Sequence, residues 1–352
     1  MTERAIIGCI LGTAVGDSLG LPYEGISPHR RAKLFGPPDR HHFLFGHGMV
    51  SDDTEHTLLV VQALIKAKGN PRQFEHLLAR SLRWWLTGLP AGVGLATLRS
   101  ILRLWRGVPP DRSGVYSAGN GPAMRSPLLG VVFGDQPEVL KEFVLRSTRM
   151  THSDPKAFFG ALTVALAAYL SSQSHDASPH DFSELICRRL PQNETAELIG
   201  LIKQASASAS KGETVCGFAE SIGCRHGVSG YIYHTVCCVI QTWLRYPGDF
   251  AGGMQEILSA GGDTDTTGAI LGGIIGARVG KEGIPIEWRS GIAEWPRTIR
   301  WMEQLGGCLA NAVQDGRDIE FPNVFPPAIL LRNLFFLVVV LFHAFRRLAP
   351  PY

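Results

Sequence analysis

The chain has 352 residues, which is enough for one large domain or two ordinary ones with an ample hydrophobic core. A formal net charge of +3 gives no nucleic-acid footprint, and 45% hydrophobic against 18% charged residues excludes a disordered chain. The seven cysteines include no CxxC pair, and an odd number in a long chain indicates free thiols in a reducing compartment, so we expect a cytoplasmic protein. The first residues, MTERAIIGCILG, do not have the pattern of a signal peptide.

Residues 5–20 are predicted to form a helix with a stripe of glycine along one face. The glycines recur at every fourth position, at Gly8, Gly12, Gly16 and Gly20. Each glycine inside a helix costs roughly 1 kcal/mol relative to alanine, so the stripe indicates that another backbone comes close to this face.

Residues 21–50, rich in Pro, Gly and His, are predicted to be a loop, and residues 51–67 (SDDTEHTLLVVQALIKA) a helix. Asp52 and Glu55 have the spacing of a capping box, which explains Asp52 without any catalytic role. Asp53 has no such explanation.

The middle of the chain is predicted to be almost entirely helical. Residues 72–106 contain Trp84, Trp85 and Trp105, which we expect in the core. The segments that follow are a Gly- and Asn-rich turn (117–130), a buried helix that begins THSDP (151–170), polar surface segments (171–215), and a turn and helix (216–244). Because almost nothing has the pattern of a strand, we expect an all-α fold.

The stretch 261–280 reads GGDTDTTGAILGGIIGARVG and repeats the glycine stripe, at Gly268, Gly272, Gly276 and Gly280. We expect this helix to pack antiparallel on the first one through the two glycine faces, which brings Asp17 and Glu24 close to Asp263 and Asp265. A membrane glycine pair is the alternative, but neither apolar run reaches the roughly 20 residues that span a bilayer.

Oxygen donors dominate the polar positions of these motifs. The carboxylates are Asp17, Glu24, Asp52, Asp53, Asp263 and Asp265, and the adjoining hydroxyls are Ser51, Thr54, Thr264 and Thr266. An all-oxygen set suits Mg²⁺ or Mn²⁺ rather than zinc, and several carboxylates are able to hold two ions. Helix capping explains Asp52 or Asp263 taken singly, but not DD and DTD together at the starts of two apolar helices.

Six motifs, in order between about residues 6 and 288, resemble those of the ADP-ribosylglycohydrolase family, which includes the enzyme that removes ADP-ribose from dinitrogen reductase. They are GCILGTAVGDSLGLPYEG, SDDT, GNGPAMR, THSD, GYIYHT and GGDTDTTGAILGGIIGA. The resemblance implies a compact all-α catalytic domain over residues 1–325 with a dinuclear metal cleft holding two Mg²⁺ or Mn²⁺ ions. It also implies hydrolysis of the bond between ADP-ribose and a modified protein side chain, typically arginine, or a related ADP-ribose conjugate.

The same resemblance implies roles for individual residues. The metal ligands are expected to be Ser51, Asp52, Asp53, Asp263, Asp265 and Thr266. Glu24 and Asp53 are the expected catalytic carboxylates, with Glu24 handling the attacking water or the leaving-group proton, and Asp17 supports the site through hydrogen bonds. The expected substrate contacts are Gly119, Asn120, Gly121, Arg125, His152 and Tyr231. The bland alternatives stay open: a simple glycine turn, an arginine paired with a carboxylate, a structural histidine and a core tyrosine.

The last segment, residues 326–352, is an intensely apolar tail. Residues 328–345 are long enough for a helix of roughly 27 Å, just short of a bilayer core. Three interpretations compete: a helix docked on the domain or a partner, an interfacial anchor, or a short spanning anchor, so residues 328–347 are a candidate membrane contact.

Two other functions fit the same residues. One is a different two-metal hydrolase, for instance on a phosphoester. The other is a binding or immunity-type protein that keeps the fold and blocks an ADP-ribosyltransferase. Because every expected ligand is present in the sequence, an active hydrolase is the favoured interpretation.

Overall fold

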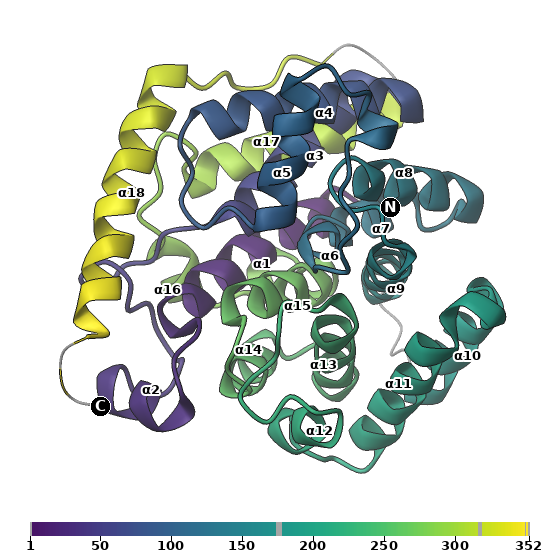
Figure 1. Cartoon of the computed structure of the whole chain (residues 1–352), viewed down its shortest axis with the longest axis vertical. Helices are drawn as coiled ribbons and strands as arrows, with labels where there is room; N and C mark the ends of the chain where they lie inside the picture. Colours follow the sequence, from purple (N-terminus) through teal and green to yellow (C-terminus); the bar gives the residue numbers. More distant parts are fainter. Residues whose placement is uncertain (1, 174–177, 316–318, 349, 351–352) are drawn as a thin grey trace.

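A computed structural model gives the structure of residues 2–173, 178–315, 319–348 and 350. These residues form eighteen α-helices, three 3-10 helices and isolated β-bridges but no β-sheet, so the predicted all-α class is confirmed (Figure 1). The α-helices are α1 (Glu3–Gly20), α2 (Pro28–Leu34), α3 (Asp52–Ala67), α4 (Pro71–Thr87), α5 (Leu95–Trp105), α6 (Gly121–Met124), α7 (Pro127–Phe133), α8 (Pro137–Arg149), α9 (Pro155–Ser172), α10 (Pro179–Arg189), α11 (Gln192–Ser210), α12 (Val215–Ser221), α13 (Ile232–Arg245), α14 (Phe250–Ser259), α15 (Thr264–Val279), α16 (Ile286–Ser290), α17 (Ile299–Asp315) and α18 (Pro326–Arg346). The 3-10 helices are Leu21–Tyr23, Pro110–Arg112 and Lys281–Gly283.

Helices α1 and α15 cross the middle of the molecule as an antiparallel pair whose glycine faces touch (Figure 1). A Cβ atom added to a glycine of α1 would come closer than 3.0 Å to a glycine carbonyl oxygen of α15, which is closer than real Cβ contacts. The matched pairs are Gly8 with Gly276, Gly12 with Gly272, and Gly16 with Gly268. The predicted glycine-to-glycine packing is therefore confirmed, and it fixes the register of the pair.

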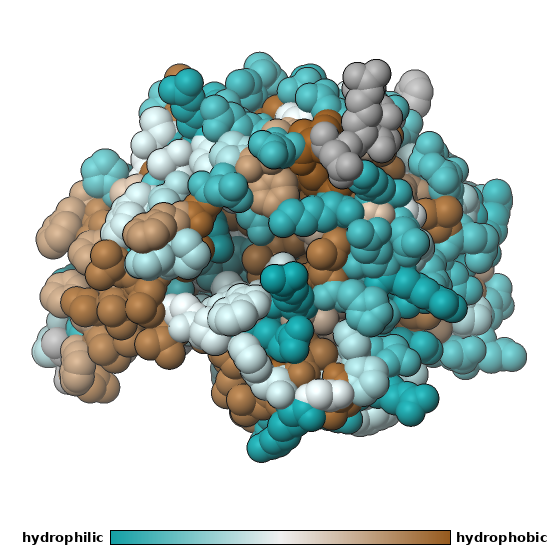
Figure 2. Space-filling model, turned by 90° about the horizontal axis from the view of Figure 1, so that it is seen from above, coloured by the Kyte–Doolittle hydropathy of each residue, from teal (hydrophilic) through white to brown (hydrophobic). Residues whose placement is uncertain are grey.

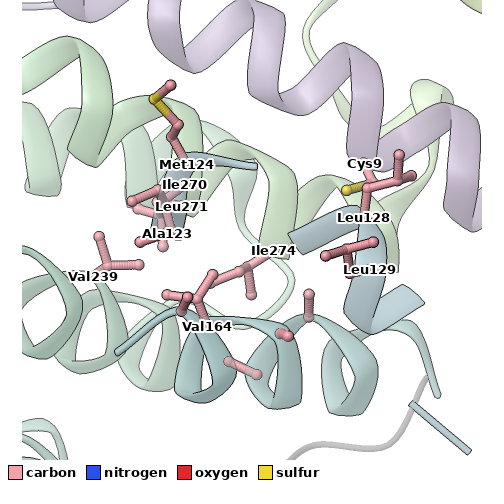
Figure 3. Packing of buried hydrophobic residues seen from close by; sticks show 14 of the residues in the cluster. Cys9, Ala123, Met124, Leu128, Leu129, Val164, Val239, Ile270, Leu271 and Ile274 are labelled. Atoms are coloured by element: carbon pink, nitrogen blue, oxygen red, sulfur yellow. The ribbon is translucent and has the colours of Figure 1, made fainter. Parts of the chain in front are cut away.

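The remaining faces of this pair are apolar and covered by other helices. A helix that is apolar all round belongs in the interior of a protein, and both α1 and α15 are buried over almost their whole length. Figure 3 shows side chains of α15 meeting those of α7, α9 and α13; Leu129, Val164, Val239 and Ile274 are all completely buried. The pair is thus held in one orientation from several sides.

Two local predictions are wrong. The loop expected over residues 21–50 contains α2, which starts after Ser27; the Ser27 hydroxyl accepts a hydrogen bond from the backbone of Arg30. Trp84 and Trp105 are 62% and 44% exposed, while Trp85 is buried. Neighbouring positions of the amphipathic α4 point to different sides, and Trp84 packs edge to face on Trp105 at the surface, with ring centroids 5.8 Å apart.

The apolar tail forms α18, which lies along one edge of the molecule (Figure 1). One face of α18 packs on the domain; its buried residues are Arg332, Asn333, Phe336, Val339 and His343. His343 Nε2 is 2.6 Å from the carbonyl oxygen of Phe43, and the two rings stack with centroids 4.8 Å apart. The opposite face is exposed and gives an apolar patch (Figure 2) that includes Leu331, Val338, Phe342 and Phe345.

Within the described residues, two helices, α1 and α18, are long and apolar enough to cross a membrane by length and composition alone. In α1, 94% of the apolar window is buried inside the fold, so α1 is a core helix; in α18 the buried share is 28%. Because a core helix passes the same test, length and composition give only weak evidence for a membrane role of α18.

The glycine contact predicts a large effect from a single methyl group. Gly12→Ala should lower the free energy of unfolding by more than about 2 kcal/mol, since the new Cβ would overlap the Gly272 carbonyl and force the helices apart. Gly200→Ala in α11 is the matched control, because nothing lies within 4 Å of a Cβ added there. That change should stabilise by roughly 0.5–1 kcal/mol through helix propensity. Urea unfolding measures both, and similar values for the two variants would contradict the packing described.

Candidate active site

The antiparallel pair places the end of α1 beside the start of α15. The Thr264 hydroxyl donates to the carbonyl oxygen of Gly20 at 2.8 Å, and the Gly25 amide donates to the Gly262 carbonyl at 2.9 Å. Glu24, just after α1, therefore lies next to the two aspartates of the DTD motif. Carboxylate oxygens of Glu24, Asp263 and Asp265 all lie within 4.8 Å of one another.

A second helix start, that of α3, is joined to the same place through Asp17. The Asp17 carboxylate is completely buried and accepts hydrogen bonds from the amides of Ser51 and Thr54 and from the Thr54 hydroxyl. The distances from Asp17 Oδ2 to the Ser51 and Thr54 nitrogens are 2.9 and 3.2 Å. Asp17 thus supports the site by fixing the chain that carries Asp52 and Asp53, as a hydrogen-bonding role would require.

Asp53 connects α3 with α15. Its Oδ2 atom accepts hydrogen bonds from the hydroxyls of Ser51 and Thr266, both at 3.2 Å. Its Oδ1 atom is buried and has no hydrogen-bond partner. A buried carboxylate oxygen without a donor is costly, which makes this atom a candidate ligand for a cation. We call Glu24, Asp52, Asp53, Asp263 and Asp265 the acidic site.

Burial, together with the charges of neighbouring carboxylates, raises the pKa values of Glu24, Asp52, Asp53 and Asp265. The pKa of Asp53 is well above its usual range, first because of burial and then because of Asp52 and Asp17. The pKa of Asp265 is also raised well above its usual range, by burial and then by the Glu24 charge. Burial raises the pKa of Asp17 to about 6 against the lowering effect of its hydrogen bonds. The starts of α3 and α15 offset part of this repulsion, since helix N-termini carry partial positive charge.

Glu24 differs from the other acidic groups because it is exposed. Its pKa is raised, first by lost hydration and then by the charge of Asp263. Glu24 is thus the acidic-site carboxylate most accessible to a molecule arriving from solvent.

The capping explanations do not hold. The N-cap of α3 is Ser51 rather than Asp52, and Glu55 accepts hydrogen bonds from Trp85 and Arg297 at 2.6 and 2.8 Å, so the predicted capping box is wrong. Asp263 precedes α15 but makes no capping hydrogen bond. Helix capping therefore does not account for the side chain of either aspartate.

The turn Gly119–Gly121 adjoins the acidic site through Asn120. The Asn120 side-chain amide donates to Asp263 Oδ2 at 2.7 Å and to the Thr235 hydroxyl at 3.0 Å. Thr235 closes the GYIYHT motif but was not expected to take part. The sequence holds no signal for Thr235, because residues 221–248 contain no Asp or Glu.

His152 and Tyr231 both contact this turn. His152 is buried under it, and a Cβ added at Gly119 would be 3.0 Å from His152 Nε2. Burial and the Arg125 charge lower the pKa of His152 to about 3, so the ring is neutral. Tyr231 pairs with Gly119 in a backbone bridge, and its hydroxyl donates to Glu197 at 2.8 Å and accepts from Lys156 at 2.9 Å.

Arg125 is placed differently from the expectation. It is completely buried, and its guanidinium donates to the Ser147 hydroxyl at 2.9 Å, the Ser147 carbonyl at 2.6 Å and the Thr151 hydroxyl at 2.6 Å. These contacts leave it inside the domain, with its pKa lowered to about 9 by burial. The structure does not bring Arg125 together with the acidic site, because Ser147 and Thr151 hold its guanidinium inside the domain.

The structure also brings in Arg347, which sequence reasoning missed. Burial lowers the pKa of Arg347, and the charges of Glu24 and Asp265 act on it in the opposite direction. Its Nε atom is buried without a hydrogen-bond partner. No sequence signal pointed to this residue, because it belongs to the tail and only the docking of α18 brings it near Glu24.

Comparison with known proteins assigns these features to one group. The family model described as ADP-ribosylglycohydrolase matches residues 1–318. The chain belongs to the ADP-ribosylglycohydrolase family. Enzymes of this family are hydrolases that remove ADP-ribose from modified substrates, and this activity agrees with an oxygen-rich site at two converging helix starts.

Several relatives and one solved structure extend over most of the chain. An ADP-ribosyl-[dinitrogen reductase] glycohydrolase of Rhodospirillum rubrum is 28% identical over 327 residues, 89% of this chain and 98% of the relative. The ADP-ribosylhydrolase ARH3 of Homo sapiens is 26% identical over 333 residues, 83% and 90% of the two chains. A solved structure titled "ADP-ribosylglycohydrolase-related protein complex" has 25% identity and a TM-score of 0.67, and covers 88% of this chain and 98% of its own.

The acidic site predicts that divalent ions stabilise the fold. Mn²⁺ at 100 times its dissociation constant should raise the free energy of unfolding by about 2.7 kcal/mol, and Mg²⁺ should act alike. Asp53→Asn keeps the size of the side chain but should lose this gain. Without metal it should be at least as stable as the wild type near pH 7, since a carboxyl with a raised folded-state pKa destabilises the fold as pH rises.

Thermal unfolding with and without the ion measures these effects. The control is Asp181→Asn, which removes a carboxylate that is 74% exposed on α10 and should keep the full metal-dependent gain. Equal gains for the wild type and Asp53→Asn would contradict a metal site at Asp53.

Proposed function

We propose that this protein is a Mg²⁺- or Mn²⁺-dependent hydrolase that removes ADP-ribose from modified protein side chains, with arginine as the linked residue. The observation that carries the proposal is the meeting of two helix starts whose oxygens face one another, including the unpartnered Asp53 Oδ1. Family membership supports the substrate class. The arginine linkage rests on the resemblance of the six motifs to those of the family. The Rhodospirillum rubrum relative is named for dinitrogen reductase, a modified protein.

Two divalent ions would fit the donors present. The ligands that we propose are Ser51, Asp52, Asp53, Asp263, Asp265 and Thr266, all carboxylates or hydroxyls, as hard cations prefer. When bound, such ions orient sugar hydroxyls and lower the pKa of water. Asp53 is the central member of this set because it already contacts Thr266 across the two helices.

Glu24 is the carboxylate that we propose for proton transfer. It lies beside Asp263 and Asp265 and is exposed, so a substrate is able to reach it. Cleavage of a glycosidic bond needs a carboxylate that takes a proton from water or gives one to the leaving group. Asp53 is the second carboxylate that we propose for catalysis. It acts from the start of α3 as a ligand of the proposed metal ions.

The turn Gly119–Gly121 is the proposed substrate platform. Asn120 ties it to Asp263, which fixes its distance from the acidic site. The amides of Gly119 and Asn120 already donate to the Ser117 hydroxyl and the Gly230 carbonyl, so the Gly121 amide is the donor that we propose for a phosphate oxygen. The half-exposed ring of Tyr231 next to the turn suits a ribose or adenine face. His152 supports the turn from below. We leave Arg125 out of the contact set because its guanidinium is already used inside the domain.

We propose a cytoplasmic location. All seven cysteines are free thiols, and Cys9, Cys237 and Cys238 are buried, as expected for a protein of a reducing compartment. Membrane attachment through α18 is not part of the proposal, since one face of this helix docks on the domain through polar contacts.

The assay that tests the function mixes the protein with Mn²⁺ and an arginine-ADP-ribosylated protein and measures free ADP-ribose. The wild type should release it, and EDTA should stop the release. Glu24→Gln should lower kcat at least about 100-fold, because proton transfer contributes at least that factor. Asp53→Asn should lower kcat by a similar factor, because it removes a proposed metal ligand. Asp181→Asn should match the wild type.

Parallel assays with serine- and thymidine-linked ADP-ribose conjugates distinguish the type of linkage that is cleaved from hydrolase activity as such. Release from a serine conjugate alone would overturn the arginine assignment and keep the hydrolase. Failure to cleave any of the three conjugates, with metal shown to be bound, would contradict the proposed function and favour a protein that only binds its target.

A further inference from the structure

A buried ion pair connects α18 to the loop that follows α16. Arg332 of α18 is 3% exposed and Glu294 is 7% exposed. Arg332 Nε donates to Glu294 Oε2 at 3.0 Å, and its Nη2 atom donates to Glu294 Oε1. The guanidinium also lies over the ring of Phe336, 4.5 Å from the centroid. Such a two-pronged pair has one preferred geometry, so it fixes orientation as well as distance.

This ion pair holds the peptide just before the acidic site. Val50 donates its amide to Glu294 Oε1 at 3.0 Å, and its carbonyl accepts from Arg332 Nη2 at 2.6 Å. The next amide, that of Ser51, donates to Asp17. Two successive residues directly before Asp52 are therefore held by hydrogen bonds. Arg332 of α18 bonds to Val50, and Asp17 of α1 bonds to Ser51.

A second contact of α18 reaches another loop beside the acidic site. The Asn333 side-chain amide donates to the Gly88 carbonyl at 2.8 Å, and Arg332 Nη1 donates to Asn333 Oδ1 at 3.1 Å. This loop continues to Gly92, where an added Cβ would lie 3.7 Å from Asp52 Oδ1. Arg332 and Asn333 thus hold two segments that flank Asp52.

We propose that Arg332 is a positioning residue for the proposed metal site. Through Arg332, α18 completes the active site, although this helix lies beyond the residues 1–318 that the family model matches. Arg332 touches no acidic-site oxygen; it acts through the Val50 peptide. This inference rests on the proposed metal-dependent function. Residues that orient metal ligands without binding the ion commonly change metal affinity by roughly 10–100-fold.

The test measures Mn²⁺ binding by the metal-free full-length protein, using the EPR signal of the free ion. Arg332→Met keeps the packing on Phe336 and removes the hydrogen bond to the Val50 carbonyl, while Glu294 still accepts from the Val50 amide. It should weaken Mn²⁺ binding roughly 10–100-fold. Leu331→Ser, on the exposed side of the same helix, is the matched control and should bind like the wild type.

A double variant separates positioning from stability. Arg332→Met leaves the Glu294 charge buried and unpaired, which lowers stability, whereas Arg332→Met with Glu294→Leu removes both charges. The double variant should regain thermal stability but keep the weak Mn²⁺ binding, because nothing then holds Val50; if Arg332→Met does not fold, this variant carries the test. Recovery of Mn²⁺ affinity together with stability, or unchanged affinity in both, would overturn the proposal. Absence of Mn²⁺ binding by the wild type would instead count against the proposed function.

Discussion

Contact between two helix backbones is the constraint on which the rest of this structure depends. Only glycine allows α1 and α15 to approach so closely, and the three facing glycine pairs leave no freedom to slide. That register sets Glu24 next to Asp263 and Asp265. The energy that glycine costs within a helix is therefore offset by burial of two apolar helices, and it produces the acidic site as a geometric consequence.

The site itself works against stability. Burial and mutual repulsion raise the pKa values of Asp52, Asp53 and Asp265, so the metal-free fold holds carboxylates in surroundings that disfavour their charge. The rest of the fold is arranged to tolerate this. Two helix starts point at the group, Asp17 fixes one of them, and the ion pair of Arg332 with Glu294 fixes the peptide before it. Divalent ions would convert this repulsion into binding energy.

Periodicity and motif spacing predicted the parts of the fold that depend on short-range pattern. The glycine repeat predicted the α1–α15 contact, because a stripe on each of two helices has few other uses. Prediction from local sequence was wrong where the chemistry of a side chain allows two different partners. Glu55 has capping-box spacing but binds Trp85 and Arg297, and Arg125 has the charge for a phosphate but binds Ser147. The contributions of Arg332 and Arg347 could not be predicted from the sequence, since only tertiary docking of the tail brings them to the site.

The most direct test of the central claim is the position of Mn²⁺ by anomalous diffraction from crystals grown with the ion. If the two helix starts form one metal centre, two anomalous peaks should lie about 3.5–4 Å apart between Ser51–Asp53 and Asp263–Thr266. Asp53 should bind through the oxygen that has no hydrogen-bond partner in the metal-free fold. A peak elsewhere on the molecule, with none between α3 and α15, would contradict the claim.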